Sequence, residues 1–238
     1  MPTFTRGDVS INYEEYGSGF PLLLFAPGGM RSNIQFWHQS PFDPTRELAD
    51  DFRVVAMDQR NAGQSRAPIT AADGWDTYTS DHIALLDHLG IKRTHTLGGC
   101  IGSSYCLNLI KKAPDRVASA VLQNPIGLYN NRDAFYEMFD GWAKSMQRHQ
   151  PNLSDAAAAE FRERMYGTDF VFNVDRDFVR KCTTPLLVLA GNDLYHPAPI
   201  SREIAELAPN AEILLEWKTP EVVAATVERV RAFLKSNQ

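Results

Sequence analysis

The sequence is poor in cysteine, has no long apolar run and carries no excess of basic residues, and each shortage excludes a class of protein. Its three cysteines, Cys100, Cys106 and Cys182, cannot all pair within one chain and form no CxxC motif. We therefore expect neither a disulfide scaffold nor a zinc ribbon. The longest apolar runs, such as residues 22–26, have the length of a strand and fall far short of the roughly 20 residues that cross a bilayer. The first six residues lack the apolar core of a signal peptide.

Basic residues are in the minority: Lys and Arg number 24 and Asp and Glu number 29, for a net charge of −5. Because nucleic acids and anionic membranes bind clustered basic side chains, this balance favours neither as a partner. Hydrophobic residues make up 44% and charged residues 22% of the 238, which excludes a disordered chain and fits one α/β domain with an insertion. We expect a cytoplasmic protein. The composition leaves open whether it forms a homo-oligomer.

Short apolar runs alternate with helical patterns along the chain, and several runs are apolar at every position. Such runs are typical of strands buried on both faces of a parallel sheet, and the alternation predicts an α/β fold with a doubly wound, mostly parallel β-sheet. Residues 9–16 predict an antiparallel edge strand. The other expected strands are residues 21–26, 53–57, 94–97, 117–122, 185–190 and 213–217. The expected helices are residues 79–89, 102–112 and 221–235.

Residues 126–183 interrupt this alternation, because they are too many for a simple crossover between two strands. They carry a helical pattern rich in aromatics and methionine, followed by Ser154 as the expected N-cap of a helix over residues 155–165. We expect a helical cap insertion over one end of a core domain formed by residues 1–125 and 184–238. The alternative is that the aromatic residues only hold the insertion together.

The stretch at positions 94–104 reads THTLGGCIGSS and predicts a strand, a sharp turn and a helix. Cys100 lies at the turn, with Gly98 and Gly102 two positions away on either side, as in a nucleophile elbow. The start of a helix offers free N–H groups and a positive dipole end, which both favour the thiolate. Cys100 is therefore the expected nucleophile. The alternative is a buried structural cysteine in a Gly-rich turn.

Three further segments accompany the elbow: LLFAPGGM at 23–30, VAMDQRNAGQS at 55–65 and LVLAGND at 187–193. In this order, the four motifs resemble the α/β-hydrolase superfamily over nearly the whole chain. The resemblance implies the α/β-hydrolase fold and a catalytic triad at the carboxyl ends of the strands.

The resemblance also implies roles for residues around the elbow. The backbone N–H groups of Gly29 and Ile101 would form an oxyanion hole, and Asp193 would be the acid of the triad. Residues 58–65 match the D-x-R-G-x-G-x-S loop of the family with Asn61 for its first glycine, and we expect this loop to brace the core beneath the site. The further pocket candidates are Pro27, Gly28, His38 and Asn124.

Two features depart from the family pattern. Cysteine replaces the usual serine, which is similar to the dienelactone hydrolases. The loop after the last strand, where the superfamily carries its histidine, reads EWKTPE at 216–221, and no histidine follows position 196. His196, three residues beyond Asp193, is the leading substitute; alternatively, it only braces its own turn. His38 is the second candidate, and structural or solvated positions are expected for His82, His88, His95 and His149.

These residues predict a cofactor-free hydrolase that opens a small ester, thioester or lactone through an acyl-cysteine intermediate. Asp193 would orient His196, which would deprotonate the thiol and later activate water. The sequence contains no Gly-rich phosphate loop and no cluster with metal-ligand spacing, so we expect neither a cofactor nor a metal. Two alternatives stay open: a lyase, cyclase or isomerase that works without acyl transfer, and a non-catalytic member that binds a small molecule.

Overall fold

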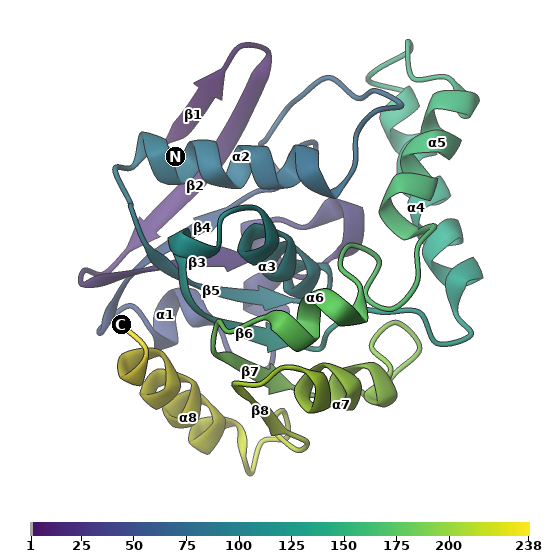
Figure 1. Ribbon diagram of the computed structural model, residues 1–238. Coiled ribbons are helices and arrows are strands. Elements are labelled where there is room, and N and C mark those ends of the chain that lie inside the picture. Colours follow the sequence, from purple (N-terminus) through teal and green to yellow (C-terminus); the bar gives the residue numbers. More distant parts are fainter. Residues whose placement is uncertain (1) are drawn as a thin grey trace.

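The computed structural model describes residues 2–238 and has the α/β-hydrolase fold, with one mostly parallel sheet between two layers of helices (Figure 1). The strand order across the sheet is β1-β2-β4-β3-β5-β6-β7-β8. The strands are β1 (Thr3–Arg6), β2 (Val9–Tyr16), β3 (Phe20–Phe25), β4 (Phe52–Met57), β5 (Thr94–Gly99), β6 (Val117–Gln123), β7 (Leu186–Leu189) and β8 (Ala211–Leu214). From β4 to β8 all neighbouring strands are parallel, so their carboxyl ends meet at one edge.

The central strands are apolar throughout because both of their faces are covered. In β3, Leu22 and Leu24 belong to the core on one side of the sheet, and Leu23 and Phe25 belong to the core on the other side. This follows from the alternation of side chains along a strand. It explains why the parallel strands could be recognised as continuous apolar runs.

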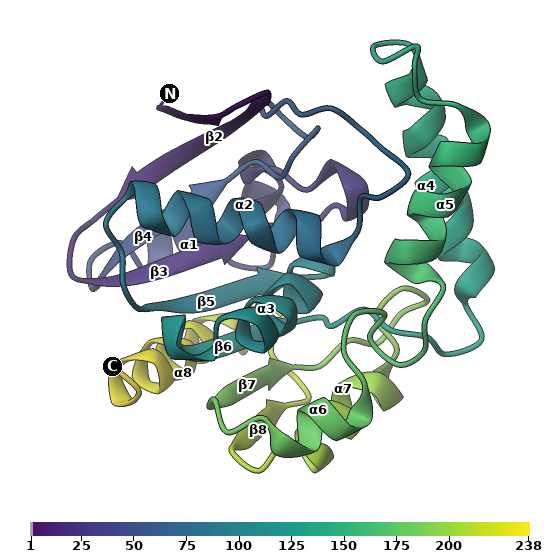
Figure 2. The same ribbon diagram turned by 45° about the horizontal axis from the view of Figure 1, so that its top comes forward.

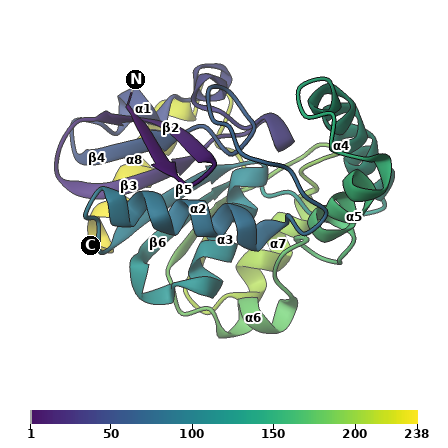
Figure 3. The same cartoon turned by 90° about the horizontal axis from the view of Figure 1, so that it is seen from above.

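The helices cover both faces of the sheet. α2 (Trp75–His88) and α3 (Ile101–Lys112) lie on one face, and α1 (Pro44–Glu47) and α8 (Val223–Ser236) lie on the other (Figure 3). On its face, α8 contributes Val227, Val230, Phe233 and Leu234 to the core. Two shorter helices flank β7, namely α6 (Arg176–Lys181) and α7 (Ala198–Leu207).

Three expectations about where individual strands and helices lie need correction. β2 is antiparallel to its neighbours as predicted, but it is not the edge strand, because β1 pairs with its outer side. α2 begins at Trp75 rather than at residue 79, since the backbone N–H of Gly74 donates to Thr77 Oγ1 and closes the first turn. β8 ends at Leu214, three residues earlier than predicted.

The segment between β6 and β7 forms two helices that pack against each other at one end of the sheet, α4 (Arg132–Gln147) and α5 (Asp155–Tyr166) (Figures 1 and 2). Phe139 and Phe161 join them with ring centroids 5.1 Å apart. Ser154 caps α5 as predicted, because its side chain accepts a hydrogen bond from the backbone N–H of Ala157 at 3.1 Å.

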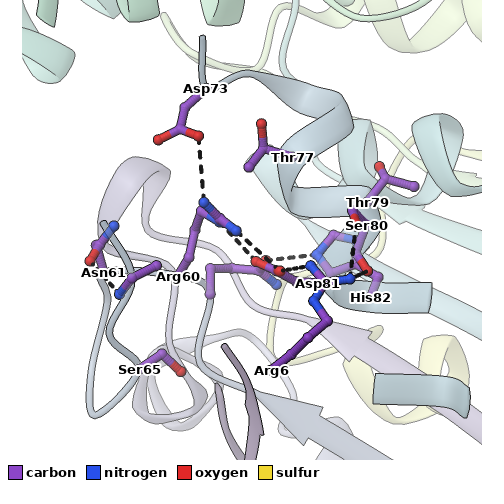
Figure 4. Close-up of polar contacts among 12 residues, drawn as sticks. Arg6, Arg60, Asn61, Ser65, Asp73, Thr77, Thr79, Ser80, Asp81 and His82 are labelled. Atoms are coloured by element: carbon purple, nitrogen blue, oxygen red, sulfur yellow. Dashed lines mark hydrogen bonds and ion pairs between the residues drawn. The ribbon is translucent and has the colours of Figure 1, made fainter. Parts of the chain in front are cut away.

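The loop after β4 braces the core, as its motif predicted. The carboxylate of Asp58 accepts hydrogen bonds from the backbone N–H groups of Ile34 at 2.9 Å and Gln64 at 2.8 Å. Further along, the buried guanidinium of Arg60 donates to Asp81 at 2.8 and 3.1 Å and reaches Asp73 at 3.5 Å (Figure 4). A buried arginine must be fully paired to be tolerated, so this network fixes the loop against α2.

Across residues 2–238, the structure contains no helix with both the length and the apolar character needed to span a bilayer.

Candidate active site

The turn between β5 and α3 holds Cys100 in a strained conformation, with φ 57° and ψ −120°. A non-glycine residue at positive φ costs about 1–3 kcal/mol and persists only where its surroundings enforce it. Here the Cys100 backbone N–H donates to the carbonyl oxygen of Gln123 at 2.9 Å and ties the turn to β6. β5, this turn and α3 together have the strand–turn–helix geometry that the motif predicted.

The two glycines that flank Cys100 are required by close backbone approaches. A Cβ at Gly98 would lie 2.1 Å from the carbonyl oxygen of Gly102, and a Cβ at Gly102 would lie 2.1 Å from the carbonyl oxygen of Phe25. Both distances are far below any van der Waals contact. Because backbone atoms cannot move aside cheaply, a side chain at either position would displace the turn that carries Cys100.

A second turn, in the loop between β7 and α7, brings Asp193 and His196 together. Nδ1 of His196 lies 2.8 Å from Oδ1 and 2.9 Å from Oδ2 of Asp193. Oδ1 also accepts hydrogen bonds from the backbone N–H groups of Tyr195 at 3.0 Å and His196 at 3.1 Å. Because the carboxylate accepts at Nδ1, the imidazole carries its proton there and leaves Nε2 for another partner.

The neighbour available to Nε2 is the thiol of Cys100. Nε2 of His196 is buried and forms no hydrogen bond of regular geometry within residues 2–238, and Cys100 is the neighbour that does most to raise the pKa of His196 against the effect of burial. His196 therefore braces its own turn through Nδ1, and its action as the base for Cys100 stays a prediction. By contrast, His38 pairs with Asp43 at 2.7 Å.

The electrostatics of the pair favour a thiolate beside an imidazolium. Burial by itself would raise the pKa of the Cys100 thiol, but the hydrogen bond and charge of His196 lower the pKa below its ordinary value. Burial also opposes the charged form of His196, yet Cys100 and then Asp193 raise the pKa of His196 to about 9. For Asp193, burial is outweighed by the hydrogen bond and charge of His196, and its pKa is lowered.

Two backbone N–H groups act in the same direction as His196. Those of Ile101 and Gly28 help to lower the pKa of the Cys100 thiol, with a smaller effect than His196. Ile101 was predicted for an oxyanion hole, whereas Gly28 was predicted only as a pocket residue. Gly29 opens a short 3-10 turn, η1 (Gly29–Arg31), and a Cβ there would lie 2.7 Å from the sulfur of Met138 on α4.

Buried tyrosines lie on the interior side of Cys100. Burial and then neighbouring negative charges, including the Cys100 thiolate, raise the pKa values of Tyr105 and Tyr166 well above the ordinary value. Both phenols are therefore neutral donors at physiological pH. Tyr166 donates to the sulfur of Met30 at 3.7 Å, and the Tyr105 hydroxyl has no hydrogen-bond partner within residues 2–238.

The loop that carries Asp193 and His196, residues 191–197, is anchored from three directions. The backbone N–H of Gly191 donates to Ser201 Oγ on α7 at 3.0 Å. Asn131 Nδ2, from the start of α4, donates to the Leu194 carbonyl at 2.7 Å. Lys218 Nζ donates to Asn192 Oδ1 at 2.6 Å. We refer to residues 191–197 below as the acid–histidine loop.

The segment after β8 has a bracing function instead of supplying a histidine. The indole N–H of Trp217 donates to the Ala190 carbonyl at 2.8 Å, immediately before the acid–histidine loop. Lys218, the next residue, reaches Asn192 inside that loop. Residues at the position where the superfamily carries its histidine thus hold the loop that contains His196.

The remaining predicted residues lie around this centre. The ring of Pro27 packs near Gly99: a Cβ added at Gly99 would lie 3.2 Å from Cδ of Pro27. Asn124 has a positive φ of 48°, its N–H donates to the Leu189 carbonyl at 2.8 Å, and its Oδ1 is buried without a hydrogen-bond partner in residues 2–238. His95 is buried against Ser119 at 2.8 Å, as expected of a structural histidine.

Sequence reasoning missed Asn131 and Lys218, which anchor the acid–histidine loop through side chains far away in the sequence. Neither lies in a motif, and only the spatial proximity of the loops shows their role. The other two cysteines do not resemble Cys100: burial raises the pKa of Cys106 to about 12 and raises that of Cys182. Within residues 2–238, no group of three His, Cys, Asp or Glu side chains is placed to hold a metal ion.

Comparisons with known proteins agree with this architecture. Residues 21–193 match the alpha/beta hydrolase fold family. RutD of Azorhizobium caulinodans is 31% identical over 124 residues, which are 52% of this chain and 44% of that protein; the chain thus matches less than half of that relative's length. Two solved structures share the fold. A meta-cleavage product hydrolase from Pseudomonas fluorescens superposes with a TM-score of 0.75 at 17% identity, over 100% of this chain and 98% of that one. The enol-lactonase of Burkholderia xenovorans superposes with a TM-score of 0.69 at 21% identity, over 98% of this chain and 100% of that one.

Proposed function

The chain belongs to the α/β-hydrolase fold family, and on this premise we propose that it is a cofactor-free hydrolase of a small ester, thioester or lactone that works through an acyl-Cys100 intermediate. The observation that carries the proposal is the position of His196, whose Nδ1 lies 2.8 Å from Asp193 and whose pKa is raised by the neighbouring Cys100 against the effect of burial. A nucleophile, a base and a group that orients the base are the three parts that covalent acyl transfer needs.

In the first half of the reaction, the Cys100 thiolate attacks the carbonyl carbon of the substrate, and the carbonyl electrons move to oxygen. The N–H groups of Ile101 and of the Gly28–Gly29 turn donate to this oxyanion. When the tetrahedral intermediate collapses, the bond to the leaving oxygen or sulfur breaks. The His196 imidazolium gives its proton to that atom, and the acyl group remains on Cys100.

In the second half, neutral His196 takes a proton from a water molecule as the water oxygen attacks the acyl carbon. Collapse releases the carboxylic acid and returns the thiolate, so the imidazolium and thiolate are both restored. Asp193 stays ionised and keeps Nδ1 of His196 in place during both halves. No redox step and no external co-reactant other than water is needed.

The nature of the nucleophile supports a particular class of substrate. Although burial opposes it, His196 lowers the pKa of the Cys100 thiol, which favours the thiolate, so attack depends less on removal of a proton from the nucleophile. Thioesters, lactones and enol or aryl esters have activated carbonyls or good leaving groups and suit such a nucleophile. The net charge of −5 supports a small-molecule substrate and disfavours nucleic acid as a partner.

We further propose that α4 and α5 act as a cap over the site. Met138 of α4 lies so close to Gly29 that a Cβ there would be 2.7 Å from its sulfur, and buried Phe135 stacks on Tyr166 with ring centroids 5.2 Å apart. These apolar side chains limit the access of water on the interior side of Cys100, which strengthens the electrostatic interactions there.

The experiment is to mix the protein with a panel of thioesters and lactones, quench at short times and measure the intact mass. The proposal expects an acyl increment that maps to Cys100, appears before steady state and is absent in Cys100→Ala. Asp193→Asn should slow its formation. Cys106→Ala is the matched control, because Cys106 is buried on α3, the helix that follows Cys100, and its replacement should leave both the increment and turnover unchanged.

Other outcomes lead to other functions. Turnover of a substrate with no adduct on Cys100 at any time would contradict the proposal and favour a lyase, cyclase or isomerase. Saturable binding with neither an adduct nor turnover would favour a non-catalytic binding protein.

A further inference from the structure

Exposed apolar side chains are concentrated on the acid–histidine loop and on the loop next to it. In residues 2–238 four large hydrophobic side chains are exposed: Tyr129 at 56%, Leu194 at 60%, Tyr195 at 37% and Leu215 at 50%. The first three come from two loops that meet at the site, while Leu215 follows β8. We refer to Tyr129, Leu194 and Tyr195 as the apolar lip.

One buried amide holds the two loops of the apolar lip together. Asn131, which is 4% exposed, accepts a hydrogen bond from the backbone N–H of Tyr129 at 2.8 Å through Oδ1. Its Nδ2 donates to the carbonyl oxygen of Leu194 at 2.7 Å. Because both ends of this amide are used, the loops keep a fixed relation, and the exposed side chains belong to a formed surface.

The apolar lip is continuous with the proposed catalytic residues. Leu194 and Tyr195 are the two residues between Asp193 and His196, so their exposed side chains lie on the same turn as the proposed acid and base. The ring of Tyr195 is 5.4 Å from that of buried Phe135, which in turn stacks on Tyr166 near Cys100. Apolar surface thus extends from solvent to the interior beside the thiol. Clustered exposed apolar surface beside a site marks a binding region.

The direction of proton transfer decides which part of a substrate would lie there. His196 gives its proton to the leaving atom, so the leaving group must sit on the His196 side of Cys100. Tyr195 and Leu194 directly precede His196 in the sequence, and Asn131 ties Tyr129 to the same loop. Resting on the function proposed above, we propose that the substrate carries an apolar alkyl or aryl group on its alcohol or thiol portion, and that this group binds against Tyr129, Leu194 and Tyr195.

The test uses S-ethyl, S-butyl and S-hexyl thioacetate, whose thiols have nearly equal basicity and differ only in apolar size. The second-order rate constant for acetyl-Cys100 formation is measured by rapid quench and intact mass. Removing one methylene fully from water is worth about a fourfold change. Because the lip stays partly open, we expect a rise on the order of tenfold from ethyl to hexyl. An acyl series with a constant S-ethyl group should show a smaller dependence on length.

Two lip variants and one matched control complete the test. Leu194→Asn and, on the other loop, Tyr129→Ser should flatten the dependence on thiol length. Tyr129 lies outside the acid–histidine loop, so its variant keeps the test informative if Leu194→Asn disturbs the Asp193–His196 turn. Leu215→Asn removes another exposed apolar side chain, which lies outside the apolar lip, and should leave the dependence as in the wild type.

The outcomes separate this inference from the function on which it rests. Acetyl-Cys100 that forms at rates independent of thiol length would overturn the inference and leave the acyl-transfer proposal standing. The inference is overturned in the same way if both lip variants keep the wild-type dependence. If no thioacetate acetylates Cys100 in the wild type, both the inference and the proposed function are overturned.

Discussion

Replacing His196 by alanine should raise the pKa of the Cys100 thiol and slow its alkylation at neutral pH. In the folded protein the pKa of His196 rises from 6.5 to about 9, mainly because Cys100 and Asp193 outweigh the cost of burial. This rise corresponds to roughly 3 kcal/mol at about 1.4 kcal/mol per pKa unit. Because coupling between two charges is reciprocal, up to that much thiolate stabilisation is lost with the imidazole.

The expected change in rate is smaller than the change in ionisation. About 3 kcal/mol corresponds to roughly a hundredfold lower thiolate population at pH 7. A more basic thiolate is also a better nucleophile, with a Brønsted coefficient of about 0.4–0.5, which restores about tenfold. We therefore expect iodoacetamide to alkylate Cys100 on the order of ten times more slowly in His196→Ala than in the wild type.

The assay follows alkylation of each cysteine by peptide mapping from pH 5 to 10, with Cys182 as the internal reference in every sample. In the wild type the Cys100 profile should begin to rise below the pH of an ordinary thiol and change again near 9, where His196 loses its proton. His38→Ala is the matched control, because His38 pairs with Asp43. An unchanged Cys100 profile in His196→Ala would refute the inference that the two side chains form an ion pair.

Three further predictions concern stability and the loop anchors. Burial lowers the pKa of His95 to about 4 and that of His82 to about 3, so below pH 6.5 the unfolded chain binds protons that the folded chain does not. In urea titrations, lowering the pH from 7 to 5 should cost roughly 2 kcal/mol of unfolding free energy for each of the two histidines. His95→Gln should remove its own share of this loss, and exposed His88→Asn should remove none. Gly141 lies within α4 with open space around its Cα, and Gly141→Ala should raise the free energy of unfolding by about 0.5–1 kcal/mol; a decrease would contradict this assignment. Lys218→Met removes the hydrogen bond to Asn192 and should slow Cys100 alkylation at pH 7 about threefold. Lys218→Arg should restore the rate. Equal rates and pH profiles in the wild type and both variants would show that Lys218 does not position the acid–histidine loop.

Much of the fold could be predicted because its parallel strands are buried on both faces. Leu22 to Phe25 alternate between two apolar layers, so the sequence shows them as an unbroken apolar run. β1 could not be recognised in this way. Its residues, Thr3–Arg6, are mostly exposed, and they join the sheet through backbone pairing with β2, which leaves little trace in the side chains.

The site residues likewise fall into those that a local sequence pattern reveals and those that it does not. Cys100 lies in a motif whose glycines are required by backbone contacts a few residues away or on the adjoining strand. Asp193 and His196 are only three positions apart in the sequence, so their contact could be anticipated. The anchors Asn131 and Lys218 reach the acid–histidine loop from 63 and 26 residues away. Contacts of that kind are determined by how the loops pack together, which no local pattern encodes.

The placement of Asp193 and His196 on one short turn has a mechanical consequence. Their mutual geometry is set within four residues by the turn itself, through hydrogen bonds that move with it. When such a loop shifts as a rigid body, the carboxylate and the imidazole travel together and their separation is conserved. The gap between imidazole and sulfur is then the single coordinate that varies, and the anchors at Ser201, Asn131 and Lys218 determine its value.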